Sequence, residues 1–256
     1  MRQLIAFTKK EYLELWRNGR LTLFGILFLL FGIMNPALAK LTPWLMEQMA
    51  DTLSEQGMQI TSVTVDAMSS WAQFYKNAPM ELLIFVVLSS GILTGEYQKG
   101  TLIHMLTKGL GRHTVLWAKG LALLGTWTLG YWLCFGVTCA YTAYFWDQSV
   151  LTHIGLGAAL VYLAGVVLIS LILLFSVVLS TGTAVMGAVL GLAAVSYLLA
   201  VIPKAAEYLP TYLLSAGVLL SGAMEPSDFL PAVLVSLGIT FTSVAAGTVL
   251  FRKKTI

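Results

Sequence analysis

Long apolar runs alternate with short polar segments along this chain. Six of the runs are long enough, at about 1.5 Å per residue, to cross a hydrocarbon core of about 30 Å as helices. We therefore predict an all-α membrane protein, a single transmembrane domain over residues 1–256. The predicted spans are residues 21–39, 78–95, 113–143, 155–179, 183–202 and 229–251.

Residues 1–20 have the pattern of an amphipathic helix. At 3.6 residues per turn, apolar and basic side chains fall on opposite faces. The apolar face is formed by Leu4, Ile5, Tyr12, Leu15 and Trp16, and the other face by Lys10, Glu14 and Arg17. This arrangement predicts an interfacial helix that lies in the headgroup region. A second short helix, also interfacial, is predicted over residues 43–56.

Residues 208–224 are apolar but marginal for a span, because Pro210 and Gly217 interrupt the run and Pro226 closes it. We predict a re-entrant hairpin of two short pieces on the outer side. A seventh full span would carry the basic end, residues 252–254, across the membrane, so charge also favours this interpretation.

Composition and charge agree with a multi-pass membrane protein. The chain is 58% hydrophobic and only 11% charged, and its mean hydropathy of +0.83 excludes a soluble domain of this size. With six spans and both termini cytoplasmic, all but Lys40, Lys76 and Lys204 of the 15 basic residues fall on the inner side. The expected location is a plasma membrane, in particular a bacterial cytoplasmic membrane.

Catalytic motifs are missing from the sequence. No Walker A motif is present, so this chain is not expected to bind ATP. His104, His113 and His153 have no carboxylate or thiol at metal-ligand spacing, and no serine hydrolase pattern occurs. We expect no catalytic residue, metal, cofactor or nucleic-acid partner.

Ionisable residues are sparse in the predicted spans. Glu81 and Lys119 fall near span ends, and the interiors of spans one, four, five and six carry none. Ion-coupled transporters place such residues near the bilayer centre. Energy for uphill transport is therefore expected from a partner.

The charged interruption at residues 95–119 is the most informative stretch. Residues 100–108 predict a short amphipathic helix with Leu102, Met105 and Leu106 on one face, bordered by Lys99, Thr101 and Lys108. Such a helix can dock into a groove of a soluble partner.

The sequence GEYQKGTL at 95–102, followed by Leu106-Thr107-Lys108, Arg112 and Lys119, resembles the cytoplasmic loop of ABC transporter type-2 permeases. The resemblance implies an exporter subunit that works as a homodimer or with a related permease, and a separate ATPase that binds ATP and Mg. It assigns the coupling helix to residues 100–108. The coupling residues that it implies are Glu96, Lys99, Gly100, Thr101, Leu102, Met105, Leu106 and Lys108. Where the family commonly has a proline before the arginine, this chain has residues 109–111, Gly-Leu-Gly.

Several alternatives remain open at this point. Glu96 could merely end the second span, and Lys108, Arg112 and Lys119 could merely anchor topology. Trp127, Tyr131 and Phe135 share a face that is either a translocation path or a packing or lipid-facing surface. The alternative function is a membrane anchor or sensor that recruits a cytoplasmic protein without transporting anything. A channel is disfavoured by the few polar residues in the spans, which suggest an amphipathic or hydrophobic cargo.

Overall fold

A computed structural model describes residues 2–55, 65–107 and 109–254, apart from the side chains of 49–55 and 104–106. Every element in this part of the chain is helical. The elements are α1 (Arg2–Arg17), α2 (Arg20–Glu55), α3 (Ala67–Ser89), α4 (Thr94–Gln98), α5 (Thr101–Thr107), α6 (Arg112–Phe145), α7 (Ile154–Val178), α8 (Gly182–Leu199), α9 (Pro203–Ala206), η1 (Pro210–Ser221), η2 (Pro226–Phe229) and α10 (Leu230–Lys253).

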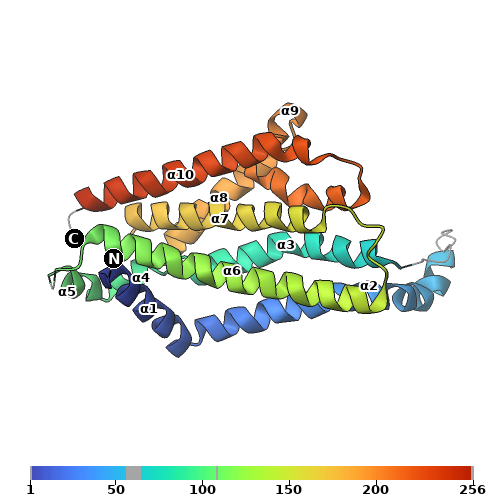
Figure 1. Cartoon of the computed structure of the whole chain (residues 1–256), viewed down its shortest axis with the longest axis horizontal. Coiled ribbons are helices and arrows are strands. Elements are labelled where there is room, and N and C mark those ends of the chain that lie inside the picture. The colour runs from blue at the N-terminus through green and yellow to red at the C-terminus, as the bar shows by residue number, and fades with distance from the viewer. Residues whose placement is uncertain (1, 56–64, 108, 255–256) are drawn as a thin grey trace.

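Within the described residues, six helical segments are long and apolar enough to cross a membrane, which confirms the predicted number of spans. They are Arg20–Gln48, Ala67–Gln98, Arg112–Phe145, Ile154–Val178, Gly182–Leu199 and Pro226–Lys253. The long helices run roughly along one axis, and both ends of the chain lie at the same end of the bundle as α1, α4 and α5 (Figure 1). We call this the α5 end.

Helix α1 forms as predicted, but with a different buried face. Phe7, Glu11 and Leu15 face the bundle at i, i+4, i+8 spacing, while Ile5 and Trp16 are exposed. Some apolar side chains of α1 therefore pack against the bundle, and others point away from it. The Glu11 carboxylate lies at the centre of the buried face.

Helix α2 continues to Glu55 through Pro36 and Pro43, so the separate helix predicted after residue 43 is wrong. Pro36 cannot donate to the carbonyl of Gly32, four residues earlier. Thr138 of α6 donates its hydroxyl to that carbonyl at 3.2 Å. A side chain from a neighbouring helix thus replaces the missing bond, as membrane helices require.

The same hydroxyl belongs to a buried polar network that joins three helices. The Asn35 side-chain amide of α2 donates to the Thr138 hydroxyl oxygen at 3.1 Å, and the Asn77 side-chain amide of α3 donates to Oδ1 of Asn35 at 2.7 Å. Ser70 and Thr142 form a further α3–α6 hydrogen bond at 2.7 Å. These bonds fix the register of α2, α3 and α6.

Helix α3 begins at Ala67, capped by Asp66, well before the predicted start at residue 78. Glu81 therefore lies inside the helix and is 2% exposed, and the prediction that it sits near a span end is wrong. Its Oε1 accepts a hydrogen bond from the Cys134 thiol at 3.3 Å. An ionisable side chain thus lies buried within a candidate span, Ala67–Gln98.

Within the stretch 208–224, residues 210–221 form one 3₁₀ helix, η1, rather than two short pieces. Leu213, Ala216 and Leu219 are buried at the three-residue spacing of such a helix. The Thr152 hydroxyl, between α6 and α7, donates to the Leu219 carbonyl at 2.7 Å. η1 is shorter than the six candidate spans and packs against α3 and α7.

The face of Trp127, Tyr131 and Phe135 packs inside the chain. Trp127 and Tyr131 are fully buried, and Phe135 is partly buried. The Trp127 indole donates to the Tyr162 carbonyl at 3.1 Å, and the Tyr131 hydroxyl donates to the Ala158 carbonyl at 2.7 Å. The geometry favours core packing over a translocation path for this face.

Gly165 of α7 makes room for the Trp127 ring, because a Cβ added there would lie 2.2 Å from a ring atom. We expect Gly165→Ala to destabilise the bundle by about 1–3 kcal/mol through overpacking. The matched change Gly136→Ala meets nothing within 4 Å and should be neutral or slightly stabilising. Unfolding of both variants in detergent checks this, and equal stability of the two would contradict the assigned α6–α7 contact.

Candidate functional site

The chain reverses at the α5 end through two short helices. Helix α4 begins directly after the turn that ends α3 and places Glu96 towards the bundle. Gly100 then adopts a φ of +67°, which glycine tolerates without steric cost. This residue allows α5 to turn away from α4.

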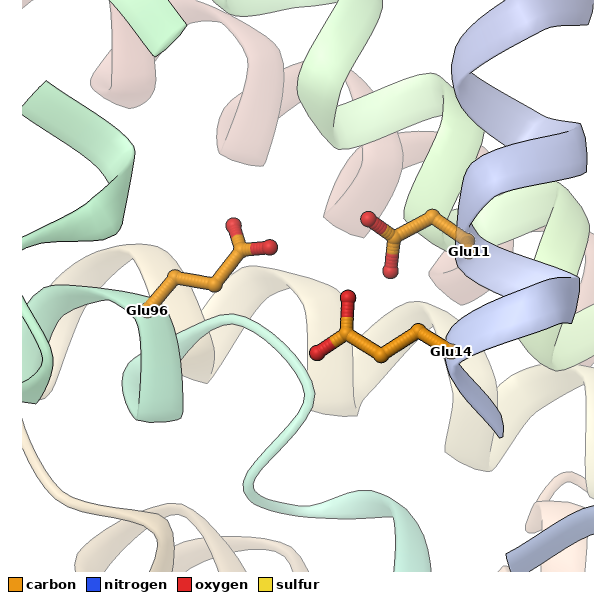
Figure 2. Close-up of side chains that lie close together, drawn as sticks. All are labelled: Glu11, Glu14 and Glu96. Atoms are coloured by element: carbon orange, nitrogen blue, oxygen red, sulfur yellow. The ribbon is translucent and has the colours of Figure 1, made fainter. Parts of the chain in front are cut away.

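Five charged side chains converge beside α4, and we call them the charge cluster. They are Lys10, Glu11, Glu14, Glu96 and Lys119. The Lys119 ammonium lies 2.9 Å from Glu11 and 3.1 Å from Glu96. The Lys10 ammonium lies between 2.7 and 3.1 Å from all three carboxylates. Figure 2 shows Glu11 and Glu14 pointing from α1 towards Glu96 on the opposite helix.

The centre of the cluster is withdrawn from solvent. The side chains of Lys119, Glu11 and Glu96 are 1%, 4% and 8% exposed. Burying such charges is costly, and removing one partner leaves another uncompensated. The cluster therefore fixes how α1, α4 and α6 meet, whatever its net contribution to stability.

Lys10 and Glu14, the more exposed members of the charge cluster, have pKa values shifted by their neighbours. Burial alone would lower the pKa of Lys10, but hydrogen bonds to Glu14 and Glu11 and the charges of Glu11 and Glu96 raise it above its ordinary value. Burial opposes ionisation of Glu14, yet the hydrogen bond from Lys10 and nearby lysine charges lower its pKa. Both groups are thus held in their charged forms.

Three carboxylates this close could in principle hold a metal ion, since one oxygen from each of Glu11, Glu14 and Glu96 lies within 4.8 Å of the others. Two ammonium groups already contact these carboxylates. A metal ion would be repelled by both, so the donor set fits pairing with lysines better than metal binding.

Basic residues also tie the ends of α7 and α10 to this region. Arg112, at the start of α6, donates to the carbonyls of Phe251, Arg252 and Lys254 at the end of α10. Lys254 donates to the Val177 carbonyl at 2.7 Å and lies over the Tyr97 ring. Cations suit these carbonyl-rich helix ends, and the contacts join the C-terminal end to the α4 region.

The predicted coupling residues fall into two groups. Glu96 is buried in the charge cluster, whereas Lys99 and Thr101 are exposed. Leu102 is fully buried against the bundle core. The expectation that Leu102 faces a partner is therefore wrong, because this side chain anchors α5 from within.

The exposed apolar side chain next to Leu102 on α5 is Ile103, whose exposed fraction is 48%. The backbone of Met105 and Leu106 is helical, but their side chains lie outside the described residues, as does Lys108. Of the described apolar side chains on α5, Ile103 is the one that a partner could reach.

Sequence reasoning missed the part played by Glu11. It had assigned Lys10 and Glu14 to a polar face and had placed Lys119 only at a span end. One signal was available: Glu11 lies midway between Phe7 and Leu15, so a charge interrupts an apolar stripe at i, i+4, i+8 spacing. A charge in such a position calls for a buried partner.

A comparison with protein families gives a match over nearly the whole chain. The family model described as ABC-2 family transporter protein covers residues 5–255. The chain belongs to the ABC-2 transporter family. No curated protein matches it. An ABC-2 family membrane protein with six apolar helices agrees with the resemblance carried by residues 95–102 and with the predicted permease class.

Replacing Lys119 with methionine should destabilise this ABC-2 protein by about 3–5 kcal/mol, because Glu11 and Glu96 would lose a buried counter-charge. Adding Glu11→Gln and Glu96→Gln to Lys119→Met should recover part of the loss. Lys9→Met, at an exposed lysine of α1, is the control and should change stability by less than about 0.5 kcal/mol. Denaturant unfolding in detergent measures all three, and a loss no larger than that of the control would disprove the buried role of Lys119.

Stability should also fall in acid through Glu14. Its pKa is lowered below the ordinary 4.5, so its contribution is present above about pH 4.5 and is lost as the pH falls through the lowered value. Glu14→Gln should flatten the stability profile in this window. Glu207→Gln, at an exposed glutamate, should leave the slope unchanged. A wild-type slope in Glu14→Gln would show that this carboxylate does not contribute to the acid response.

Proposed function

We propose that this chain is the permease subunit of an ATP-driven exporter, coupled to a separate ATPase that binds ATP and Mg. Six spans form a small bundle, and the buried side chains of Trp127 and Tyr131 fill its interior. A path between two chains, either two copies or one copy and a related permease, avoids that packed core. The ABC-2 family assignment supports this arrangement.

The α5 end is proposed to be cytoplasmic. It holds both termini (Figure 1) and most of the basic residues of the sequence, which the positive-inside rule places in the cytoplasm. The membrane in question is then a plasma membrane.

The observation that carries the proposal is the two-sided character of α5. Leu102 fixes the helix to the core, while Ile103 remains available for a partner. Just before α5, Glu96 is held by Lys119 of α6 and Lys10 of α1. A displacement of α5 by an ATPase would therefore reach α1 and α6 through buried ion pairs.

Ile103→Glu tests the docking role. Placing a charge at an apolar contact should reduce co-purification of an ABC-type ATPase at least roughly tenfold. Ile103→Leu keeps the apolar surface and should retain the ATPase. Membrane insertion of both variants is the control for folding, because Ile103 is half-exposed and outside the core.

ATP hydrolysis by the purified complex distinguishes the exporter hypothesis from the alternative of a membrane anchor or sensor. An exporter complex should hydrolyse ATP after reconstitution into vesicles. A partner that binds the wild-type chain, depends on Ile103 and hydrolyses no ATP would instead support a membrane anchor. Unchanged ATPase recovery with Ile103→Glu would refute docking at this face of α5.

A further inference from the structure

A charged cavity of about 360 Å³ lies beside the charge cluster, between α1, the start of α2 and α4. Its wall includes the carboxylates of Glu11, Glu14 and Glu96, and also Arg20 and Lys99. The last two are exposed and form no ion pair within the described part of the chain. The cavity thus offers anionic groups in its interior and two unpaired cations at its edge.

One carboxylate oxygen in this wall lacks a partner. Oε2 of Glu96 is buried and accepts no hydrogen bond from the described residues. Counting the charge cluster itself, three carboxylates meet two ammonium groups, so one negative charge is in excess. Figure 2 shows the Glu96 carboxylate directed towards those of Glu11 and Glu14. A cationic hydrogen-bond donor would satisfy both the oxygen and the charge.

The position of the cavity points to a lipid. The first span begins at Arg20, and α1 turns the apolar side chains Ile5, Leu13 and Trp16 away from the bundle. A helix with an outward apolar face beside the start of a span lies at the membrane interface. The cavity is therefore at the level of the lipid headgroups.

We propose that this cavity binds the headgroup of a phospholipid that carries a primary ammonium. Arg20 and Lys99 contact the phosphate, and the ammonium reaches the carboxylates of Glu14 and Glu96. A primary ammonium has three N–H donors, so it can bond the unpartnered oxygen of Glu96 while it contacts Glu14. Basic pockets between helices at a membrane surface are known to bind lipid headgroups.

The alternatives leave part of the cavity unsatisfied. A trimethylammonium headgroup has no N–H donor for Glu96. A glycerol headgroup carries no positive charge to place against the carboxylates of the charge cluster. A metal ion would leave Arg20 and Lys99 without a counter-ion. Only a headgroup with both charges and N–H donors matches all of these residues.

Native mass spectrometry of the purified chain with phosphatidylethanolamine, phosphatidylcholine and phosphatidylglycerol of identical acyl chains tests the proposal. We expect phosphatidylethanolamine to bind roughly tenfold more tightly than either of the others, as the loss of one charged hydrogen bond implies. Soluble glycerophosphoethanolamine should bind far more weakly. Equal binding of the three lipids, or equally tight binding of the soluble headgroup, would overturn the assignment to a membrane lipid.

Variants locate the two halves of the headgroup. Arg20→Gln and Lys99→Gln should each weaken phosphatidylethanolamine binding roughly tenfold, and Glu14→Gln should abolish its advantage over phosphatidylcholine. The matched control is Arg17→Gln, because Arg17 is an exposed arginine on α1 that does not line the cavity. Its binding should equal the wild type. Unfolding temperatures measured in phosphatidylcholine identify any misfolded variant, and equal weakening by Arg17→Gln and Arg20→Gln would refute the site.

Discussion

The α5 end depends on one buried cation and its two counter-ions. Lys119 enters from α6 and pairs with Glu11 of α1 and Glu96 of α4, so three elements far apart in sequence meet at one ammonium group. Because none of these charges can be left alone in a dry environment, the elements cannot shift independently without a large cost. The position of α5 follows from this constraint, since only Lys99 and Gly100 separate it from α4.

Neutral hydrogen bonds impose a similar constraint deeper in the bundle. A proline in α2 frees a carbonyl, Thr138 of α6 binds it, and Asn35 and Asn77 extend the network to α3. Individual hydrogen bonds in membranes contribute only about 0.6 kcal/mol on average. Their value here is positional, because each partner lies on a different helix. Helix α8, by contrast, buries few side chains, chiefly Val185 and Val189. The helices that the polar network joins, α2, α3 and α6, are therefore the more firmly packed part of the fold.

The sequence predicted what depends on local pattern and missed what depends on distant partners. Hydropathy located six spans, because length and apolar content suffice for that. It ended the first span at residue 39, where the apolar run stops, whereas α2 continues through Pro36 and Pro43. The Thr138 hydroxyl that binds the carbonyl freed by Pro36 is about a hundred residues away in the sequence. The predicted second span began at residue 78, whereas α3 begins at Ala67 and contains Pro79 within the helix. The amphipathic pattern of residues 100–108 located α5 but could not tell which of Leu102 and Ile103 meets the core.

Because Leu102 is buried and Ile103 is exposed, the seven-residue helix α5 contacts the core on one side and is open to a partner on the other. A helix of this length is unstable alone, so α5 keeps its shape only through its contacts, with Leu102 packed in the core on one side. If α5 receives a push, the load passes through α4 to Lys119, on the same helix as Trp127 and Tyr131. Those two rings are packed against α7 by hydrogen bonds to the Tyr162 and Ala158 carbonyls. A movement of α5 would therefore be passed along α6, which carries Lys119 of the charge cluster as well as Trp127 and Tyr131 of the aromatic core.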